Sequence, residues 1–251
     1  MGKVRFSESR FKIIRNTMIP KIVHYCWFGQ TELPALAQEC VASWHEHMPD
    51  WSYMRWDENN FDIVAAPLYV QQAYEAKKYA FVSDYVRLWA LEQYGGVYLD
   101  TDVTVLRSFE PLLSDTAFIG REESKAQLFG TCVMGCEAHC LWVRDMMSLY
   151  DGIPFIKPDG SYDLTTNVQR LGARMKQSES DVAKWGLRIY THDYFSPITS
   201  TRVMRKTANT YAIHYYAGSW EDKNPIAQWR EWTLTREVIN LLVQIKRKIF
   251  D

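Results

Sequence analysis

Short apolar, β-branched runs alternate with longer runs of helical composition along the chain, and this order predicts an α/β fold. The short runs have the length and composition of strands, whereas the longer runs have the length of helices. Strands that alternate with helices favour three layers, a mixed central sheet flanked by helices, here with a helical C-terminal extension. Strands are predicted at 21–28, 52–56, 97–106, 116–121, 130–135, 187–190 and 211–216, and helices at 33–48, 69–94, 138–150, 164–177 and 225–250.

Composition narrows the classes of protein that the chain can be. Hydrophobic residues make up 47% and charged residues 24% of its 251 positions, which excludes a disordered chain, a coiled coil and a collagen. The net charge of −1 gives no positive field, so nucleic acid is not an expected partner. No segment rich in Pro, Gly or Ser divides the chain, so we predict a single domain over residues 1–251.

The sequence also gives an expectation about location. Residues 1–21 are basic and polar and lack the apolar stretch of a signal peptide. No apolar run is long enough to span a membrane. Five cysteines in a chain without an export signal suggest reduced thiols, so we expect a cytoplasmic protein.

Two aspartates follow an apolar run and a Gly-Gly pair, in the segment Gly95-Gly96-Val97-Tyr98-Leu99-Asp100-Thr101-Asp102. In an extended chain, Tyr98, Asp100 and Asp102 share one face. Two carboxylates this close repel each other, and either a proton or a cation between them relieves the repulsion. Carboxylate oxygens suit Mg²⁺ or Mn²⁺, and such an ion can hold a diphosphate. The alternative is a pair of solvated aspartates in a loop.

A second pair of charges lies in the long helix predicted at 69–94. Asp84 and Arg87 are three residues apart, so they share a helix face. The segment around them is apolar nearly all round, which is typical of a buried helix. A buried Asp and Arg must be paired or used in a site. The alternative is an ion pair within the helix.

These motifs occur in an order that resembles a known family, the DXD-containing sugar transferases of bacterial capsule and surface-polysaccharide synthesis. The chain is similar, more distantly, to fungal initiating mannosyltransferases and to the glucosylating domains of large clostridial toxins. The resemblance covers residues 19–220 as a catalytic core, followed by the helix predicted at 225–251. It rests on the segments 19–29 (IPKIVHYCWFG), 43–44 (SW), 56–57 (WD), 80–87 (AFVSDYVR), 95–102 (GGVYLDTD) and 214–220 (HYYAGSW).

The resemblance implies a GT-A type fold, a nucleotide-sugar donor, a divalent metal (Mn²⁺ or Mg²⁺) and retention of anomeric configuration. It implies a catalytic set made of Asp84 and Arg87, which grip the donor sugar, Asp100 beside the ribose and sugar, and Asp102 as the direct metal ligand. His214 is implied as a further metal ligand. The donor-binding residues implied are Trp27 stacked on the base, Phe28, Tyr98, Asn167, Ser219 and Trp220.

The function expected from this resemblance is transfer of a hexose from a nucleotide diphosphate sugar, expected to be a UDP-sugar. The acceptor is a hydroxyl of a glycan or lipid-linked oligosaccharide, in capsule, exopolysaccharide or lipopolysaccharide synthesis. Two alternatives come from other classes. The 97–104 segment also resembles the first motif of haloacid-dehalogenase-type phosphatases, with Asp100 as nucleophile and Asp102 as acid and base. A non-enzymatic carbohydrate-binding protein is the third interpretation.

Two further features leave alternatives open. Cys132, Cys136 and Cys140 have a regular spacing, which we interpret as buried free thiols rather than as a zinc site. The 225–251 segment combines an apolar stripe with a basic end. A packing helix with a solvated tip is the first interpretation, and peripheral contact with the inner face of a membrane is the alternative.

Overall fold

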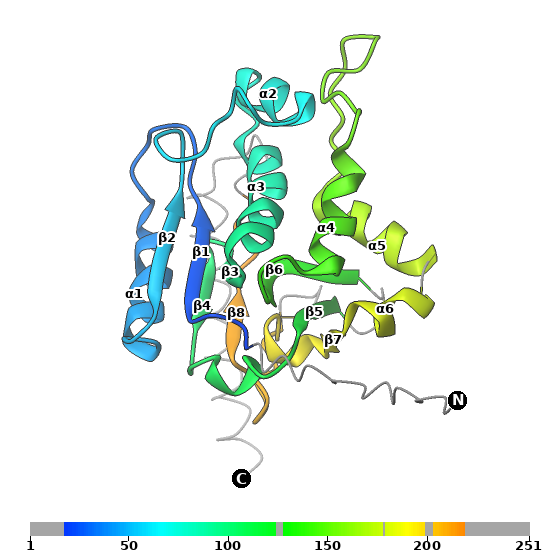
Figure 1. The fold of residues 1–251 in the computed structure, drawn as a ribbon. Helices are drawn as coiled ribbons and strands as arrows, with labels where there is room; N and C mark the ends of the chain where they lie inside the picture. The colour runs from blue at the N-terminus through cyan, green and yellow to red at the C-terminus, as the bar shows by residue number, and fades with distance from the viewer. Residues whose placement is uncertain (1–17, 124–127, 178, 199–202, 219–251) are drawn as a thin grey trace, which may run out of the picture.

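The computed structural model describes residues 18–123, 128–177, 179–198 and 203–218. A mixed sheet of six strands is flanked by helices, which confirms the predicted fold class (Figure 1). Its strand order is β2 (Ser52–Trp56), β1 (Ile22–Cys26), β3 (Gly96–Leu99), β6 (Leu128–Cys136), β5 (Ala117–Glu123) and β7 (Leu187–Tyr190). A separate ribbon pairs β4 (Val103–Val105) with β8 (Ala212–His214).

The strand directions bring three strand ends together. Strand β1 is parallel to both β2 and β3, and β5 is parallel to β7. Strand β6 is antiparallel to its neighbours β3 and β5. The carboxyl ends of β1, β3 and β5 therefore lie at the same edge of the sheet, the edge at which open α/β sheets bind ligands.

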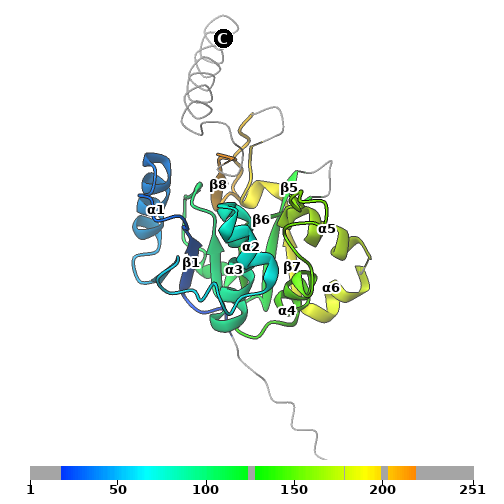
Figure 2. The same ribbon diagram turned by 90° about the horizontal axis from the view of Figure 1, so that it is seen from above.

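Helices cover the sheet on one face and a mixed layer covers the other. One hydrophobic cluster joins the sheet to α2, α3, α4, α5 and α6, and the second joins it to α1 and the β4–β8 ribbon. Helix α1 lies at the β2 end, and α3 crosses the centre (Figures 1 and 2). The helices are α1 (Ala35–His47), α2 (Leu68–Glu75), α3 (Tyr79–Tyr94), α4 (Leu141–Met147), α5 (Asn167–Gln177) and α6 (Glu179–Trp185), with short 3-10 turns at Glu110–Leu112, Ser148–Tyr150 and His192–Tyr194.

Helix α3 is buried as its sequence predicts, but the single helix predicted at 69–94 is two helices. Lys77 has a φ of 56°, and Lys78 donates its N–H to the carbonyl of Ala73 at 2.9 Å. Lys77 donates to Tyr74, also at 2.9 Å. This pair of bonds ends α2 in a Schellman motif, with a lysine at the position that usually holds glycine. The chain then turns before α3 begins at Tyr79.

The strand predicted at 97–106 is also divided. Strand β3 ends at Leu99, and the N–H of Val103 donates to the carbonyl of Asp100 at 3.1 Å in a turn. The chain then leaves the sheet as β4. Tyr98, Asp100 and Asp102 do come together, but the cause differs from the predicted alternation along a strand, because the extended chain ends before Asp100 and a turn carries both aspartates.

Three further predictions concern the cysteines, the absence of a membrane-spanning segment and the C-terminal helix. All five cysteines are buried and none of them forms a disulfide; the interpretation of Cys132, Cys136 and Cys140 as free thiols rather than zinc ligands stays a prediction. Within the described residues, none of the helices has the length and apolar character needed to cross a bilayer. The helix predicted at 225–251 lies outside the described residues.

Candidate active site

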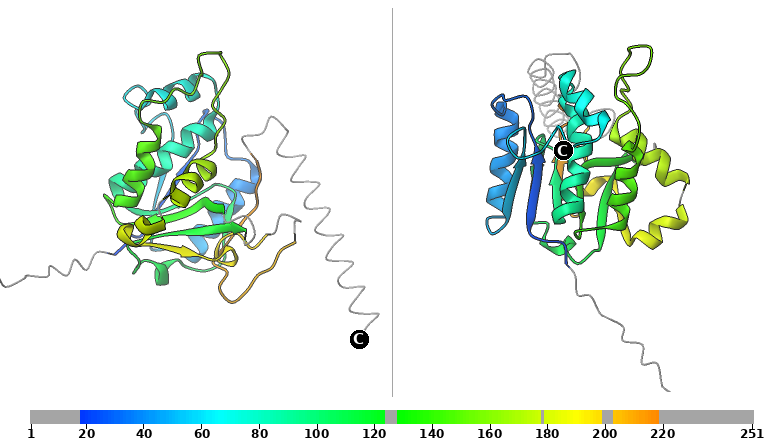
Figure 3. Two further views of the ribbon diagram at one scale, coloured as in Figure 1. Left: turned by 90° about the vertical axis from the view of Figure 1, so that its right-hand side faces the viewer. Right: turned by 45° about the horizontal axis from the view of Figure 1, so that its top comes forward.

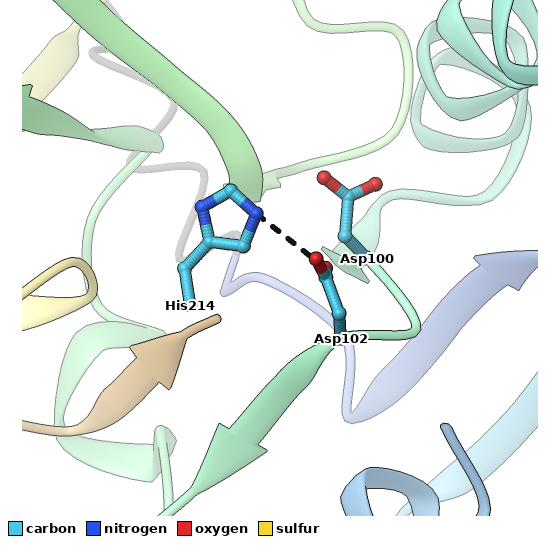
Figure 4. Close-up of side chains that lie close together, drawn as sticks. All are labelled: Asp100, Asp102 and His214. Atoms are coloured by element: carbon cyan, nitrogen blue, oxygen red, sulfur yellow. Dashed lines mark ion pairs between the residues drawn. The ribbon is translucent and has the colours of Figure 1, made fainter. Parts of the chain in front are cut away.

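A tight turn carries the two aspartates at the carboxyl end of β3. The N–H of Asp100 donates to the carbonyl of Cys132 at 2.9 Å, which ties the turn to β6. In the ribbon behind it, Val103 of β4 pairs with His214 of β8. This pairing places the His214 side chain beside the turn, so that the imidazole and both carboxylates face one region (Figure 4).

The three side chains form a candidate metal site. Ligand atoms of Asp100, Asp102 and His214 all lie within 4.8 Å of one another. His214 Nε2 is 3.4 Å from Asp102 Oδ1, and the N–H of Ala217 donates to Asp102 Oδ2 at 2.8 Å. Two carboxylates and an imidazole are a donor set that fits a divalent cation. Asp100 and Asp102 thus lie where the sequence predicts a metal, and His214 completes the group.

Burial and ion pairing shift the pKa values of Asp102 and His214 in opposite directions. Burial by itself would raise the pKa of Asp102, but the charge and hydrogen bond of His214 and the N–H of Ala217 hold that pKa below its usual value. Burial would lower the pKa of His214, whereas the Cys132 sulfur and the Asp102 carboxylate raise it well above the ordinary value. Asp102 and His214 therefore form an ion pair when only the protein's own groups act on them.

Arg87 joins the two pairs of charges that the sequence singles out. Its Nη2 is 3.1 Å from Asp84 Oδ1, and its Nη1 is 3.1 Å from Asp100 Oδ1. Tyr98 donates its hydroxyl to the same oxygen of Asp100 at 2.9 Å, and the guanidinium lies 4.6 Å from the centre of the Tyr98 ring. Arg87 therefore joins the ion pair within helix α3 to the candidate metal site, because it binds Asp84 of the helix and Asp100 of the metal site.

An irregularity in β6 supplies a further contact of Arg87. Ile119 of β5 pairs with Met134, but Gly120 pairs with Gly130, so residues 131–133 bulge from the ladder. The Thr131 carbonyl accepts from Arg87 Nη1 at 2.8 Å. Thr131 was not predicted as a site residue, and the sequence holds no signal for it because a carbonyl is common to every residue.

Asp84 is held on its other side by the start of α5. Its Oδ2 accepts the backbone N–H of Asn167 at 2.9 Å, and its backbone carbonyl accepts from Asn167 Nδ2 at 3.1 Å. Asn167 is only 1% exposed. Burial raises the pKa of Asp84 to about 6, although Arg87 and the Asn167 N–H act to lower it. The structure thus brings Asn167 against the predicted sugar-binding pair.

The predicted donor-binding residues differ in position. Trp27 follows β1 at the same sheet edge as Asp100 and is partly exposed, with its indole N–H bonded to the Thr31 carbonyl at 2.9 Å. Phe28 is buried in the core, where its ring packs edge-on against Phe61. Tyr98 is buried within the Arg87 network. Ser219 and Trp220 lie outside the described residues.

One acidic residue near the aspartates was missed by sequence reasoning. Glu122 lies near the carboxyl end of β5. Burial raises its pKa, and its carboxylate is close enough to interact with His214, Asp100 and Asp102. A Cβ on Gly130 would lie 2.9 Å from Glu122 Cγ, so the glycine makes room for this side chain. No motif surrounds Glu122, and only the strand order places it here.

Sequence comparison with known proteins finds matches in the region that carries both charged pairs. Residues 34–119, which include both charged pairs, match the family model described as "Glycosyltransferase sugar-binding region containing DXD motif". "Inositol phosphoceramide mannosyltransferase 3" of Schizosaccharomyces pombe is 34% identical over 111 residues, which are 43% of this chain and 31% of that protein. "Mannosyl phosphorylinositol ceramide synthase SUR1" of Saccharomyces cerevisiae is 28% identical over 144 residues, 55% of this chain and 37% of that protein.

The matches define a class of enzyme. The family description and the relatives' names are those of sugar transferases, which confirms the predicted enzyme class at the level of the sugar-binding region. The chain spans about a third of the length of these curated relatives. Among solved structures, "PaToxG Glycosyltransferase" is similar, with 17% identity and a TM-score of 0.47 over 67% of this chain and 74% of that one.

Proposed function

We propose that this chain is a metal-dependent, retaining glycosyltransferase of GT-A type that moves a hexose from a nucleotide diphosphate sugar to a hydroxyl of a glycan or lipid-linked acceptor. The observation that carries the proposal is the convergence of Asp100, Asp102 and His214 within 4.8 Å beside the Asp84–Arg87 pair. A cation site next to a pair able to bind hydroxyls suits a ligand with a charged diphosphate and a neutral sugar.

The contacts of the two aspartates support a cation at this place. Arg87 and Tyr98 contact Oδ1 of Asp100, and Ala217 contacts Oδ2 of Asp102. The other oxygen of Asp102, Oδ1, faces His214 Nε2 at 3.4 Å, so a cation would bind between these two groups in place of their ion pair, with a carboxylate oxygen of Asp100 as the third ligand atom. A mixed set of carboxylate and imidazole ligands favours Mn²⁺ over Mg²⁺, because imidazole is a better ligand for transition ions. When bound, the ion neutralises charge on the departing diphosphate.

The protein groups around the cation have separate roles in the proposal. Trp27 stacks on the base of the donor, with a flat indole face at the sheet edge. Asp84 and Arg87 bind hydroxyls of the donor sugar, because a carboxylate accepts and a guanidinium donates. Tyr98 and Arg87 fix the Asp100 carboxylate. We infer attack from the same face as the leaving group, with the departing diphosphate oxygen taking the proton of the acceptor hydroxyl.

The donor, acceptor and location belong to the same proposal. We propose a UDP-sugar as donor, and the relatives named as mannosyltransferases support mannose as a further sugar to test. The resemblance to capsule and surface-polysaccharide transferases supports a glycan or lipid-linked oligosaccharide acceptor and a cytoplasmic location. Contact with the inner face of a membrane is proposed through residues 225–251, outside the described part of the chain.

The test is release of nucleotide diphosphate from UDP-glucose, UDP-galactose and GDP-mannose by the purified full chain, with Mn²⁺, with Mg²⁺ and with EDTA. We expect turnover of one donor with metal and none with chelator. Asp102→Asn should remove this activity, because one ligand oxygen is replaced by a weakly coordinating amide. The matched control is Asp50→Asn, since Asp50 is an exposed partner of Lys21 away from the site.

Two results would contradict the proposal. Full activity of Asp102→Asn, or activity that is unchanged by EDTA, would exclude the metal scheme. Release of phosphate from a phosphomonoester without turnover of any nucleotide sugar would support the phosphatase alternative. The configuration of the product, read by proton NMR of the anomeric signal, tests retention separately.

A further inference from the structure

Asp84 meets the first turn of a helix that comes much later in the chain. Helix α5 begins at Asn167, and the backbone N–H of this residue donates to Asp84 Oδ2 at 2.9 Å. The first N–H groups of a helix have no partner within the helix and carry its positive end. In α5 this positive end therefore faces a buried carboxylate of the proposed sugar site.

The helix has its own cap, so Asp84 is not needed to start it. Thr166 donates its N–H to Gln169 Oε1 at 2.9 Å, and the Gln169 N–H donates to Thr166 Oγ1 at 3.4 Å. This reciprocal pair is a capping box. The bond from Asn167 to Asp84 is thus additional to the local cap, and it links α5 to α3.

The first turn of α5 is also fixed from outside the helix. Arg170 forms an ion pair with Asp163, and its guanidinium lies 5.1 Å from the Tyr69 ring and 5.2 Å from the Tyr150 ring. The Tyr150 hydroxyl contacts Asn167 Oδ1 at 3.5 Å. Tyr69 belongs to α2, which lies beside the 151–166 loop at one end of the molecule (Figure 3). The start of α5 is therefore anchored to several elements and keeps a fixed place relative to Asp84.

We propose that the first turn of α5 is a positioning element for the transfer site: the Asn167 backbone N–H and the positive end of the helix keep Asp84 ionised and oriented toward the donor sugar. Asn167 is then a positioning residue that acts through Asp84 by its main chain, rather than a side chain that contacts sugar. The expected effect on donor turnover rests on the proposed function, whereas the expected effect of the helix on the pKa of Asp84 does not.

The charged and phenolic groups around Asp84 come from five parts of the fold. Arg87 on α3 and Arg170 on α5 favour the carboxylate, whereas Asp100 after β3 disfavours it. The phenols of Tyr69 on α2 and Tyr150 on a 3-10 turn also face it. These groups are unchanged when only the main chain at residue 167 is altered, so such a change isolates the contribution of the N–H.

The first test uses ¹⁵N–¹H NMR of the full chain and needs no substrate. The Asn167 amide should shift with pH in a single step that follows Asp84, and Asp84→Asn should abolish the step. An Asn167 amide that does not titrate in the protein, or that titrates unchanged in Asp84→Asn, overturns the inference. The absence of nucleotide-sugar turnover in the unaltered chain would instead count against the proposed function, and this titration would still decide the role of α5.

The second test compares Asn167→Pro with Asn167→Ala. Proline is well accepted at the first helical position, but it removes the N–H and places its ring in the path of the hydrogen bond. Alanine removes the side chain and keeps the N–H. Loss of one hydrogen bond to a charged group should raise the pKa of Asp84 by about one pH unit in the proline variant relative to the alanine variant. We expect kcat/KM for the donor to be about tenfold lower in the proline variant than in the alanine variant.

Equal losses in the two variants would overturn the inference, because the side chain would then carry the whole effect. Thermal unfolding and circular dichroism check that both variants fold. If the proline variant does not fold, the amide titration of the unaltered chain remains the deciding measurement.

Discussion

His24 is a buried histidine whose two ring nitrogens both take part in hydrogen bonds, so lowering the pH should destabilise the fold through it. Its Nε2 lies 2.7 Å from the Gly95 carbonyl, which only accepts, so Nε2 carries the proton. The indole N–H of Trp56 donates to Nδ1 at 3.1 Å, so Nδ1 must stay unprotonated. His24 is 0% exposed. A second proton would lose the bond to Trp56 and leave a charge buried between β1, β2 and the end of α3.

The size of the effect follows from the pKa. Burial lowers the pKa of His24 from 6.5 to about 4, although the Gly95 carbonyl opposes the shift. Between these values the unfolded chain binds more protons than the folded one, so stability falls as pH falls through this window. At 1.36 kcal/mol for each pH unit the full effect is about 3 kcal/mol, and between pH 7 and pH 5 it is about 2 kcal/mol.

The measurement is urea unfolding, followed by tryptophan fluorescence, at pH 7, 6 and 5. The control is His24→Gln, whose amide supplies a donor and an acceptor but does not titrate in this range. The variant should be less stable than the unaltered chain at pH 7. Between pH 7 and pH 5, however, the free energy of unfolding should decrease by about 2 kcal/mol less in the variant than in the unaltered chain. Parallel pH dependences for the two proteins would refute the argument.

Three further predictions test the site and the core. Arg87→Lys keeps the charge but not the fork that spans two carboxylates, so kcat/KM for the donor should fall about 100-fold in steady-state kinetics; a loss under threefold would contradict the bridging role. Mn²⁺ at about 100 times its Kd should stabilise the fold by about 2.7 kcal/mol in thermal unfolding, and His214→Ala should lose most of this gain. Gly135→Ala places a Cβ 2.2 Å from the Phe118 ring and should lower the free energy of unfolding by about 1–3 kcal/mol. Gly172→Ala places a Cβ with no atom within 4 Å and should raise the free energy of unfolding by about 1 kcal/mol through α5. Denaturant unfolding that ranks the two variants in the opposite order would refute the packing argument.

Local sequence patterns predicted most of the elements, but they missed α6 (Glu179–Trp185) and the breaks within two others. The 69–94 run contains no glycine or proline near Lys77, so composition gives no sign that α2 ends there. The break arises because Lys77 adopts a left-handed conformation, in which the N–H groups of Lys77 and Lys78 donate to the carbonyls of Tyr74 and Ala73. The 97–106 run ends at Leu99 for a different reason, since β4 gains its hydrogen bonds from β8 rather than from the sheet.

The sequence predicted those parts of the candidate site whose residues are close together along the chain, and it missed parts that distant segments bring together. The spacing of Asp84 and Arg87 on a helix, and of Asp100 and Asp102 after a strand, is local information. The place of His214 came only from a family resemblance, because no local pattern reports a pairing across the fold. Glu122 and the carbonyl of Thr131 reach the site through the β5–β6 pairing and its bulge. Such contributions depend on strand order, which single-sequence periodicity does not contain.

The pairing of β4 with β8 has a consequence for how the protein is made. Asp102 emerges from the ribosome long before its partners, since the N–H that binds it belongs to Ala217, 115 residues later. A nascent chain that already holds the sheet strands still lacks the imidazole and the backbone contacts that complete the candidate cation site. This site can therefore form only after Ala217 has been synthesised, and closing this long loop is expected to be a slow step of folding.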